Sequence, residues 1–293
     1  MRFTRRIDVE QKIQTHRSLS EFSTFGIGGA IRFFLEVGTI AEMQEAYAFA
    51  RAKNLPLLIV GKGSNSLFSD LPFEGLAVLN KIDFCAIEEA NVHVGAGYSF
   101  SLLGVQTARK GLSGLEFASG IPASVGGAVF MNAGANGQET ADALKAVTYL
   151  FEYGELREFF RPELAFSYRS SPFQTMRGCI LAARFQLTTK ADARKQQLQI
   201  IDYRMKTQPY KDKSAGCVFR NPAPGISAGA LIDQAGLKGL SVGGAKVSDR
   251  HANFIVNVGG ATARDVLELI AQIQARVQEK TGYHLEPEIR LLP

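Results

Sequence analysis

Short apolar runs alternate with stretches of helical periodicity along the 293 residues of this chain. Apolar runs bounded by glycine or polar residues predict strands at 31–37, 57–60, 92–94, 147–151, 156–160, 180–187, 254–258 and 288–292. Apolar positions three and four residues apart predict helices at 41–53, 99–110, 191–206, 227–235 and 263–280. The last helix has the clearest pattern, because Thr262 and Asp265 can form a capping box before it and Gly282 ends it. The mixture predicts an α+β protein that begins with a β-α-β arrangement.

Composition and charge narrow the classes of protein to consider. Apolar residues make up 46% of the chain and charged residues 21%, which excludes a mainly disordered protein. The length suggests about two domains, and the main boundary is expected near residue 190. The net charge of +5 is compatible with an anionic ligand. Because lysine and arginine form no concentrated stripe with aromatic residues, nucleic-acid binding is not expected.

Nothing in the sequence indicates a membrane segment, an export signal or a metal site. No run of about 18 apolar residues occurs, and the basic residues of Met1-Arg-Phe-Thr-Arg-Arg-Ile-Asp8 are not followed by an apolar stretch. We therefore expect a cytoplasmic protein. The three cysteines are too few and too scattered for a disulfide framework, and metal-ligand spacings are missing. Cys85 and Cys179 are expected to be buried and inert.

Glycine is over-represented: 29 of the 293 residues, about a tenth, are glycine, whereas a typical share is about 7%. The loop Gly61-Lys-Gly-Ser-Asn65 follows a strand, and its amides can form an anion-binding nest. It matches neither the P-loop nor the Rossmann pattern, and a tight strand-exit turn is the alternative. The longer segment Gly114–Gly134 combines glycines with serines and lacks charge after Glu116. This composition favours a backbone that lies against a large flat or phosphorylated ligand over a buried crossover.

Three further segments contain candidate reactive groups. Tyr168 and Arg169 are neighbours, and a strand there would send them to opposite faces; a surface arginine is the commoner alternative. Cys217 follows a glycine turn and precedes an expected strand, and this segment alone favours a small buried thiol over a site residue. Glu288 lies in Glu286-Pro-Glu288, where solvated carboxylates at the start of a strand are the default interpretation.

Several motifs, taken in order from about residue 20 to the C-terminus, together resemble one enzyme family. They are Thr24-Phe-Gly-Ile-Gly-Gly29, Gly61–Asn65, Gly111–Gly134, Phe166-Ser-Tyr-Arg169, Ser214–Pro222, Ala235-Gly-Leu-Lys-Gly239, Val247–Asn253 and Leu285-Glu-Pro-Glu288. The chain is similar to the UDP-N-acetylenolpyruvoylglucosamine reductases (MurB). The resemblance implies a two-part FAD-binding domain of the vanillyl-alcohol-oxidase (PCMH) type at 1–73 and 74–190, followed by an α/β substrate-binding domain at 191–293.

The resemblance also implies a reaction. NADPH reduces bound FAD, a hydride passes from FAD N5 to C3 of the enolpyruvyl group of UDP-N-acetylglucosamine-enolpyruvate, and C2 is protonated. The product is UDP-N-acetylmuramate, an intermediate of peptidoglycan synthesis. The partner is thus a small UDP-sugar, and we expect a monomer or a weak dimer. Another FAD oxidoreductase, or a non-catalytic nucleotide-binding protein, remains as an alternative.

The same resemblance assigns roles to individual residues. Arg169 stabilises the developing negative charge, Glu288 holds the arginine or a water, and Cys217 stands where the family usually has the serine that donates a proton to C2. Substrate contacts are implied for Tyr168, Asn221, Lys238 and His251. Cofactor contacts are implied for Gly61, Lys62, Gly63, Ser64, Asn65, Ser66, Ser119, Gly120, Ile121, Pro122, Ala123, Ser124, Gly126, Gly127, Asn132 and Gly134. The chain has no room after Arg169 for the tyrosine-bearing loop of one subtype, so it resembles the shorter subtype.

Overall fold

The computed structural model describes residues 9–293. The N-terminal residues on which the absence of a secretory signal was judged, 1–8, lie outside the described residues. The chain forms two compact units: unit 1 contains the described residues up to Thr15 with Arg32–Lys62 and Glu74–Asp202, and unit 2 contains His16–Ile31, Gly63–Phe73 and Tyr203–Pro293. The division into domains at 1–73, 74–190 and 191–293 stays a prediction. Within residues 9–293, no helix has the length and apolar character needed to cross a bilayer.

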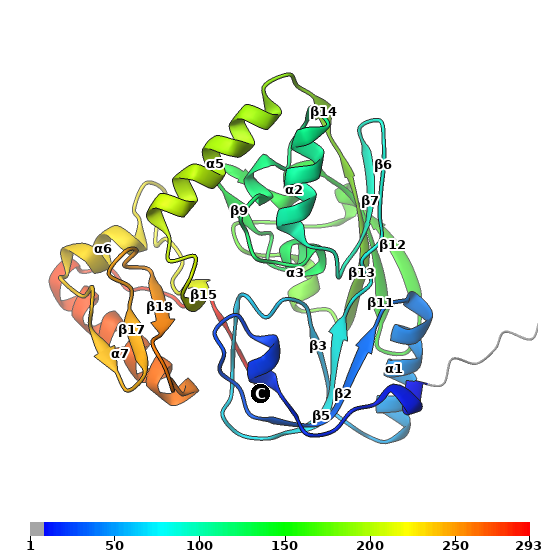
Figure 1. Ribbon diagram of the computed structural model, residues 1–293, viewed down its shortest axis with the longest axis horizontal. Coiled ribbons are helices and arrows are strands. Elements are labelled where there is room, and N and C mark those ends of the chain that lie inside the picture. Colours follow the sequence, from blue (N-terminus) through cyan, green and yellow to red (C-terminus); the bar gives the residue numbers. More distant parts are fainter. Residues whose placement is uncertain (1–8) are drawn as a thin grey trace, which may run out of the picture. The chain divides into compact units, whose positions relative to one another are not determined.

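The first sheet of unit 1 contains the expected β-α-β arrangement with an extra strand inserted into it. Strands β2 (Ala30–Val37), β5 (Phe73–Asn80) and β3 (Leu57–Val60) lie in that order, and β3 runs parallel to β5. Helix α1 (Ile40–Ala52) follows β2 (Figure 1). Its Met43 and Ala46 are buried in one core with residues of β2 and β5. The sequence pattern did not predict β5, whose nearly continuous buried run lacks the alternation of a half-exposed strand.

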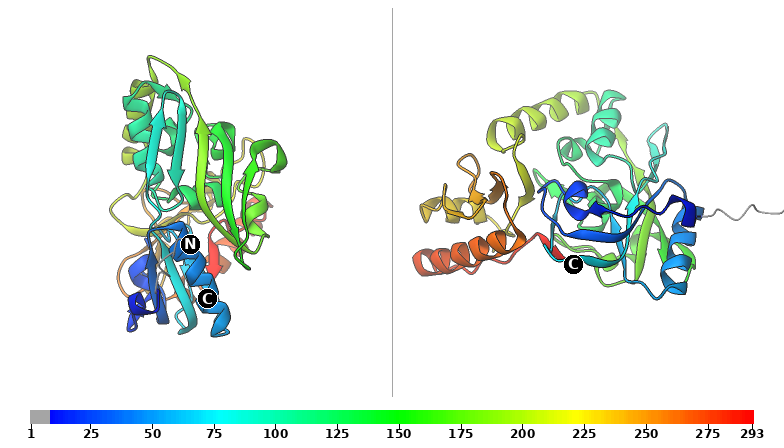
Figure 2. Two further views of the ribbon diagram at one scale, coloured as in Figure 1. Left: turned by 90° about the vertical axis from the view of Figure 1, so that its right-hand side faces the viewer. Right: turned by 60° about the horizontal axis from the view of Figure 1, so that its bottom comes forward.

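The second sheet of unit 1 is antiparallel and carries helices on one face. Its order is β12 (Leu156–Phe160), β11 (Leu144–Phe151), β13 (Gly178–Gln186), β7 (Asn91–Gly95) and β6 (Cys85–Glu88). Figure 2 shows these strands in cyan to green. Phe100 and Leu103 of α2 (Phe100–Arg109) and Val129 of α3 (Val125–Phe130) share a core with this sheet. The hairpin expected from 147–151 and 156–160 is confirmed.

Unit 1 also contains two short strand pairs and a short α-helix, besides the short 3-10 helices Val9–Lys12, Glu116–Ala118, Arg161–Glu163 and Pro172–Gln174.

The strand pairs and the α-helix have the following bounds. They are β8 (Leu112–Ser113) paired with β14 (Thr188–Thr189), β9 (Gly134–Ala135) paired with β10 (Gln138–Glu139), and helix α4 (Thr140–Ala143). Helix α5 (Ala193–Thr207) begins in unit 1 and ends in unit 2.

Unit 2 contains a four-stranded antiparallel sheet covered by helices. The strand order is β15 (Lys213–Cys217), β18 (Phe254–Asn257), β17 (Ala245–Val247) and β16 (Ser241–Val242). Helices α6 (Ala228–Gln234) and α7 (Ala263–Thr281) pack into the same core as this sheet. A separate parallel pair joins β4 (Ser66–Phe68) to β19 (Arg290–Leu292), and β1 (Arg17–Ser18) pairs with the start of β2.

Helix α7 follows its sequence pattern closely. Thr262 and Asp265 form the expected capping box, and Gly282 ends the helix in the left-handed conformation at φ 75°. The five apolar residues of the stripe, Val266, Leu269, Ile270, Ile273 and Val277, are all buried. Capping and periodicity are local signals, so the sequence alone predicts this helix.

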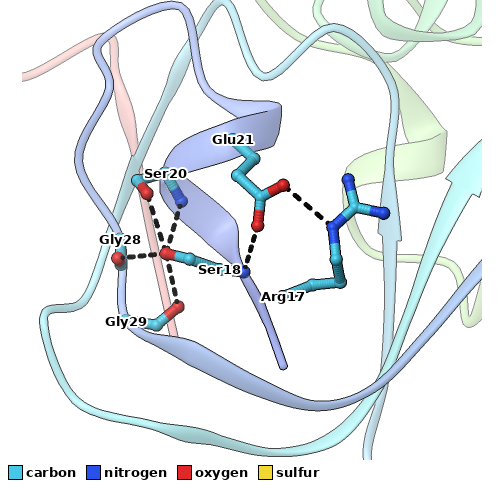
Figure 3. A network of polar contacts seen from close by, with 6 residues as sticks. All are labelled: Arg17, Ser18, Ser20, Glu21, Gly28 and Gly29. Atoms are coloured by element: carbon cyan, nitrogen blue, oxygen red, sulfur yellow. Dashed lines mark hydrogen bonds and ion pairs between the residues drawn. The ribbon is translucent and has the colours of Figure 1, made fainter. Parts of the chain in front are cut away.

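A polar network in unit 2 holds the glycine-rich segment that ends at Gly29. The Ser18 hydroxyl donates to the carbonyl oxygens of Gly28 at 2.9 Å and of Gly29 at 3.2 Å (Figure 3). Glu21 accepts from the Ser18 backbone N–H and pairs with Arg17 at 2.8 Å. Ser18 and Glu21 form a capping box at the start of the short helix η2 (Leu19–Phe22), from which the chain continues into Thr24.

Candidate active site

The start of the 61–66 loop lies against the glycine-rich segment within unit 1. A Cβ atom at Gly61 would collide with the Ser124 hydroxyl, and one at Gly126 would come within 2.9 Å of the Ala96 Cβ. Ser124 caps helix α3, because its hydroxyl accepts from the Gly127 N–H at 3.3 Å. Gly61 and Gly126 are therefore required for close packing inside unit 1. That the backbone of this segment lies against a ligand stays a prediction.

The amides of the 61–66 loop fit a large ligand with hydrogen-bond acceptors. The backbone N–H groups of Lys62, Gly63, Ser64 and Asn65 have no acceptor among residues 9–293. The Ser119 hydroxyl also lacks a partner in the described part of the chain, but protein atoms enclose it completely, so a ligand does not reach it in this structure. Lys62 is exposed and Ser64 and Asn65 are half-buried, so amides of this loop are accessible to a ligand. A dinucleotide such as FAD carries the acceptors that these donors lack.

The other glycine-segment candidates occupy different settings. Gly120 has φ 84° and its N–H donates to the Ser101 hydroxyl at 2.7 Å, and Gly134 belongs to β9. Ile121 and Ala123 are half-buried, and Pro122 and Gly127 are exposed. In unit 2, Ser66 begins strand β4.

Asn132 has a structural role that its sequence context did not reveal. Its side chain is completely buried and donates to Glu139 at 2.7 Å and to the Ser167 carbonyl at 2.9 Å. Its amide oxygen accepts from the Ala141 N–H at 3.0 Å. The side chain is therefore used inside unit 1, where it fastens the turn that carries Tyr168 and Arg169.

Arg169 lies on a turn rather than a strand, which corrects the idea of opposite faces. Ser167 and Ser170 bridge the turn, and Arg169 has a left-handed φ of 56°. The guanidinium consequently stacks over the Tyr168 ring at 4.8 Å and donates to the Gly134 carbonyl at 3.0 Å. Left-handed backbone is uncommon for a residue other than glycine, and it persists where surrounding contacts enforce it.

Cys217 lies at the end of a strand, not before one as its sequence context predicts. Strand β15 pairs with β18, and the register shifts between Ser214 and Cys217. Gly216 sits in this irregularity with φ 78°. A bulge of this kind re-aims the side chain that follows it. The thiol of Cys217 is half-buried, so the segment does not hold the fully buried cysteine favoured from its sequence alone.

Unit 2 brings Cys217 and Glu288 into neighbouring main-chain positions. The Glu288 N–H donates to the carbonyl of Val218 at 2.7 Å, next to Cys217. Asn65 joins them, because its side chain donates to the Glu288 carbonyl at 3.3 Å and its own carbonyl accepts from the Arg290 N–H at 2.8 Å. Arg169 belongs to unit 1, so the convergence of all three predicted catalytic residues stays a prediction.

The remaining substrate candidates lie in unit 2. Lys238 forms an exposed ion pair with Asp233 at 2.8 Å, and Asn221 accepts from the Ala228 N–H at 3.1 Å. Burial, followed by the charge of Lys238, lowers the pKa of His251 below its usual value. His251 is therefore uncharged at neutral pH and can offer a phosphate a hydrogen bond but no charge.

Two supporting residues were not singled out from the sequence. The Asn253 side chain is buried. Its oxygen accepts from the Phe219 N–H at 2.9 Å, and its amide nitrogen donates to the Phe219 carbonyl at 2.8 Å. Thr24 bonds to the backbone of both Gly63 and Ser214. Both lie in motifs of the family resemblance, but their partners are distant in sequence, so no local pattern indicates them.

Cys85 and Cys179 were both expected to be buried, and this is confirmed for Cys179 alone. Cys179 is buried, and burial raises the pKa of its thiol to about 12. Cys85 is only half-buried, because β6 is the edge strand of its sheet. Burial also raises the Cys85 pKa, so neither thiol is a ready nucleophile at neutral pH.

Comparison with known proteins decides the family. Over 294 aligned residues, covering 100% of this chain and 98% of the relative, the chain is 57% identical to UDP-N-acetylenolpyruvoylglucosamine reductase of Protochlamydia amoebophila. The chain belongs to the UDP-N-acetylenolpyruvoylglucosamine reductase family. The reductase of Chlamydia muridarum is 48% identical, with 96% of this chain and 95% of that protein covered.

Other matches to the reductase family agree with this assignment. A family model described as an FAD binding domain matches residues 31–159, and one described as the C-terminal domain of UDP-N-acetylenolpyruvoylglucosamine reductase matches residues 208–292. The crystal structure of the enzyme from Thermus caldophilus covers 96% of this chain and 100% of its own, with 40% identity and a TM-score of 0.81. The expected fold, an FAD-binding domain of the PCMH type before a second domain, is confirmed.

Proposed function

We propose that this protein is an FAD-containing oxidoreductase that uses NADPH to reduce the enolpyruvyl group of UDP-N-acetylglucosamine-enolpyruvate. The product is UDP-N-acetylmuramate, an intermediate of peptidoglycan synthesis. The observation that carries the proposal is 57% identity to a reductase of this family over the whole chain. The unpaired amides of Lys62–Asn65 support it, because within residues 9–293 they lack acceptors and can donate to a bound dinucleotide.

The residues around the cofactor bind and orient it. The 61–66 loop and the 119–134 segment would hold its diphosphate on backbone N–H groups, where successive amides carry partial positive charge. When bound, FAD supplies the hydride that NADPH delivers to it. Residues 1–73 and 74–190 would form the two parts of this cofactor site, and 191–293 would bind the substrate.

Arg169, Cys217 and Glu288 would complete the reaction. After the hydride reaches C3, negative charge develops on C2 and its carboxylate, and the guanidinium of Arg169 would stabilise that charge. The Cys217 thiol would deliver a proton to C2. A thiol has an ordinary pKa near 8.5, far below that of an alcohol, so it releases a proton more readily than the serine usual in the family. Glu288 would hold the arginine or a water in place.

Tyr168, Asn221, Lys238 and His251 would contact the UDP-sugar. The chain runs from Arg169 through the short helix Pro172–Gln174 directly into β13 at Gly178, which supports the shorter subtype. We further propose that the protein acts in the cytoplasm as a monomer or a weak dimer, with no nucleic-acid or membrane partner.

The decisive assay follows NADPH oxidation by the purified, FAD-loaded protein. We expect oxidation that depends on UDP-N-acetylglucosamine-enolpyruvate, with one UDP-N-acetylmuramate formed for each NADPH consumed. A yellow protein that oxidises NADPH only with another acceptor would favour a different flavin oxidoreductase. A protein that stays colourless after incubation with FAD would favour a non-catalytic nucleotide-binding role and refute the proposal.

A further inference from the structure

Thr24 connects two segments of unit 2 that are remote from each other in sequence. Its hydroxyl donates to the Ser214 carbonyl at 2.7 Å, and its own carbonyl accepts from the Ser214 N–H at 3.1 Å. Its backbone N–H is directed at the Gly63 carbonyl, 3.4 Å away. Thr24 thus touches both the loop with unpaired amides and the strand that ends at Cys217.

The hydroxyl takes the place of a backbone donor along one edge of β15. In an antiparallel strand the N–H and C=O of one residue point to the same edge. At Ser214 both groups point to Thr24, while the opposite edge of β15 pairs with β18. Because the Thr24 N–H is aimed at Gly63, only its hydroxyl is available to bond the Ser214 carbonyl.

Ser214 is the last regularly paired residue of β15 before the irregularity that ends at Cys217. The direction of the Cys217 side chain depends on where this irregularity starts, and at that point Ser214 is held between Val256 of β18 and Thr24. The 61–66 loop is fixed against the same segment, because a Cβ atom at Gly63 would strike the Phe22 carbonyl. Gly216 in turn faces the Ser64 carbonyl, since a Cβ atom at Gly216 would lie 3.9 Å from that oxygen.

We propose that Thr24 is a positioning residue for the protonation step, because its hydroxyl sets the alignment of Cys217 relative to the 63–65 loop. This inference rests on the proposed function, in which Cys217 donates the proton. Thr24 touches neither substrate nor cofactor in this role and acts through the backbone of Ser214. Because small misplacements of a reacting group slow a reaction strongly, loss of the hydroxyl would slow proton delivery while leaving hydride acceptance from NADPH intact.

The test uses stopped-flow absorbance on the FAD-loaded full chain in H₂O and D₂O. Thr24→Val keeps the shape of the side chain but leaves the Ser214 carbonyl without its donor. Because a substrate enolate that is not protonated at C2 can return its hydride, net re-oxidation of the reduced protein depends on proton delivery. We expect this net re-oxidation by substrate to slow by about tenfold or more, with a larger solvent isotope effect. Reduction by NADPH should keep its wild-type rate, and Thr24→Ser, which retains the hydroxyl, should restore re-oxidation.

Ser18→Ala is the matched control, because it also removes a hydroxyl that donates to backbone carbonyls in unit 2, but to those of Gly28 and Gly29 rather than Ser214 (Figure 3). It should lower thermal stability without changing the re-oxidation rate or the isotope effect. If Thr24→Val does not fold, Thr24→Cys provides a weaker donor and should give an intermediate rate.

The outcomes separate this inference from the proposed function. A wild-type protein without substrate-dependent NADPH oxidation refutes the proposed function itself. A working wild type combined with a Thr24→Val variant that re-oxidises at the wild-type rate overturns the inference about Thr24. Slowing of equal size in Ser18→Ala and Thr24→Val also overturns it, because general destabilisation would then explain both.

Discussion

In unit 1 two side chains support the turn of the predicted catalytic Arg169, in addition to the main-chain bonds between Ser167 and Ser170. In unit 2 the segments that carry Cys217 and Glu288 are joined mainly by main-chain hydrogen bonds. The Asn132 side chain bonds the turn of Arg169, and the Gln174 side chain donates to the Arg169 carbonyl at 3.0 Å. In unit 2, by contrast, the Glu288 N–H bonds the Val218 carbonyl, and Cys217 ends a paired strand.

This difference determines how each residue can be probed. A substitution at Cys217 leaves its main-chain contacts in place, so the variant reports on the chemistry of the thiol. The Arg169 turn can instead be disturbed from a distance by changing a single supporting side chain. The following variants exploit that contrast, beginning with the largest expected effect.

Removal of the Cys217 thiol should have the largest effect on turnover. Cys217→Ala loses the proposed proton donor, and general acid catalysis typically contributes about 10²- to 10⁴-fold. Cys217→Ser should keep a usable fraction of the activity because a hydroxyl can still carry a proton to C2. Both rates are measured as substrate-dependent NADPH oxidation. Wild-type turnover by Cys217→Ala would show that another group is the donor.

Arg169→Ala should reduce kcat by about 10²- to 10³-fold, the usual cost of removing one group that stabilises developing charge. Arg169→Lys retains the charge but loses the planar guanidinium, so an intermediate rate is expected. The reduction of bound FAD by NADPH, followed by its absorbance, should be unchanged in both. Unchanged kcat in Arg169→Ala would remove this residue from the mechanism.

Asn132→Ala tests the side-chain support in unit 1. It removes the bonds to Glu139 and to the Ser167 carbonyl, and it leaves the buried Ala141 N–H without its acceptor. The free energy of unfolding should fall by about 1–3 kcal/mol. Urea denaturation measures the change, and kcat should fall because the Arg169 turn loosens. Asn91→Ala is the control, since Asn91 is exposed and its side chain makes no hydrogen bond within residues 9–293. Equal stability of the two variants would contradict the support role.

The smallest effect concerns pH and unit 2. The folded protein lowers the pKa of His251, mainly by burial, whereas the unfolded chain binds that proton near the ordinary value of about 6.5. The unfolded state therefore binds more protons below that pH, and stability should fall as the pH drops from 7 toward 5. His251→Asn should flatten this part of the profile, measured by urea denaturation at each pH. An identical slope in the variant would exclude His251 as its source.

Sequence patterns predicted the elements that local signals define. Capping, periodicity and a terminal glycine located α7 within one residue, and the β11–β12 hairpin was found from two apolar runs around a turn. Strand β5 was missed because a buried parallel strand lacks alternation. The sequence indicates a strand after Cys217, but strand β15 ends at that residue. The reason is that Gly216, which suggests a turn, lies inside a bulged strand.

The candidate site was predicted mainly through the family resemblance, and its supports were not. Arg169, Cys217 and Glu288 have no shared spacing, so only their motifs connected them. Thr24 acts on Ser214 across 190 positions, and Asn132 acts on Ser167 across 35. Such contacts depend on the tertiary fold, which places distant backbone groups within reach of one side chain.

A crystal structure of the complex with FAD and UDP-N-acetylglucosamine-enolpyruvate tests the central claim most directly. We predict that Arg169, Cys217 and Glu288 surround the enolpyruvyl group, with the Cys217 sulfur facing C2 and the 61–66 amides on the FAD diphosphate. A complex in which these three side chains lie tens of ångströms apart, or in which packed side chains fill the place of the flavin ring, would contradict it.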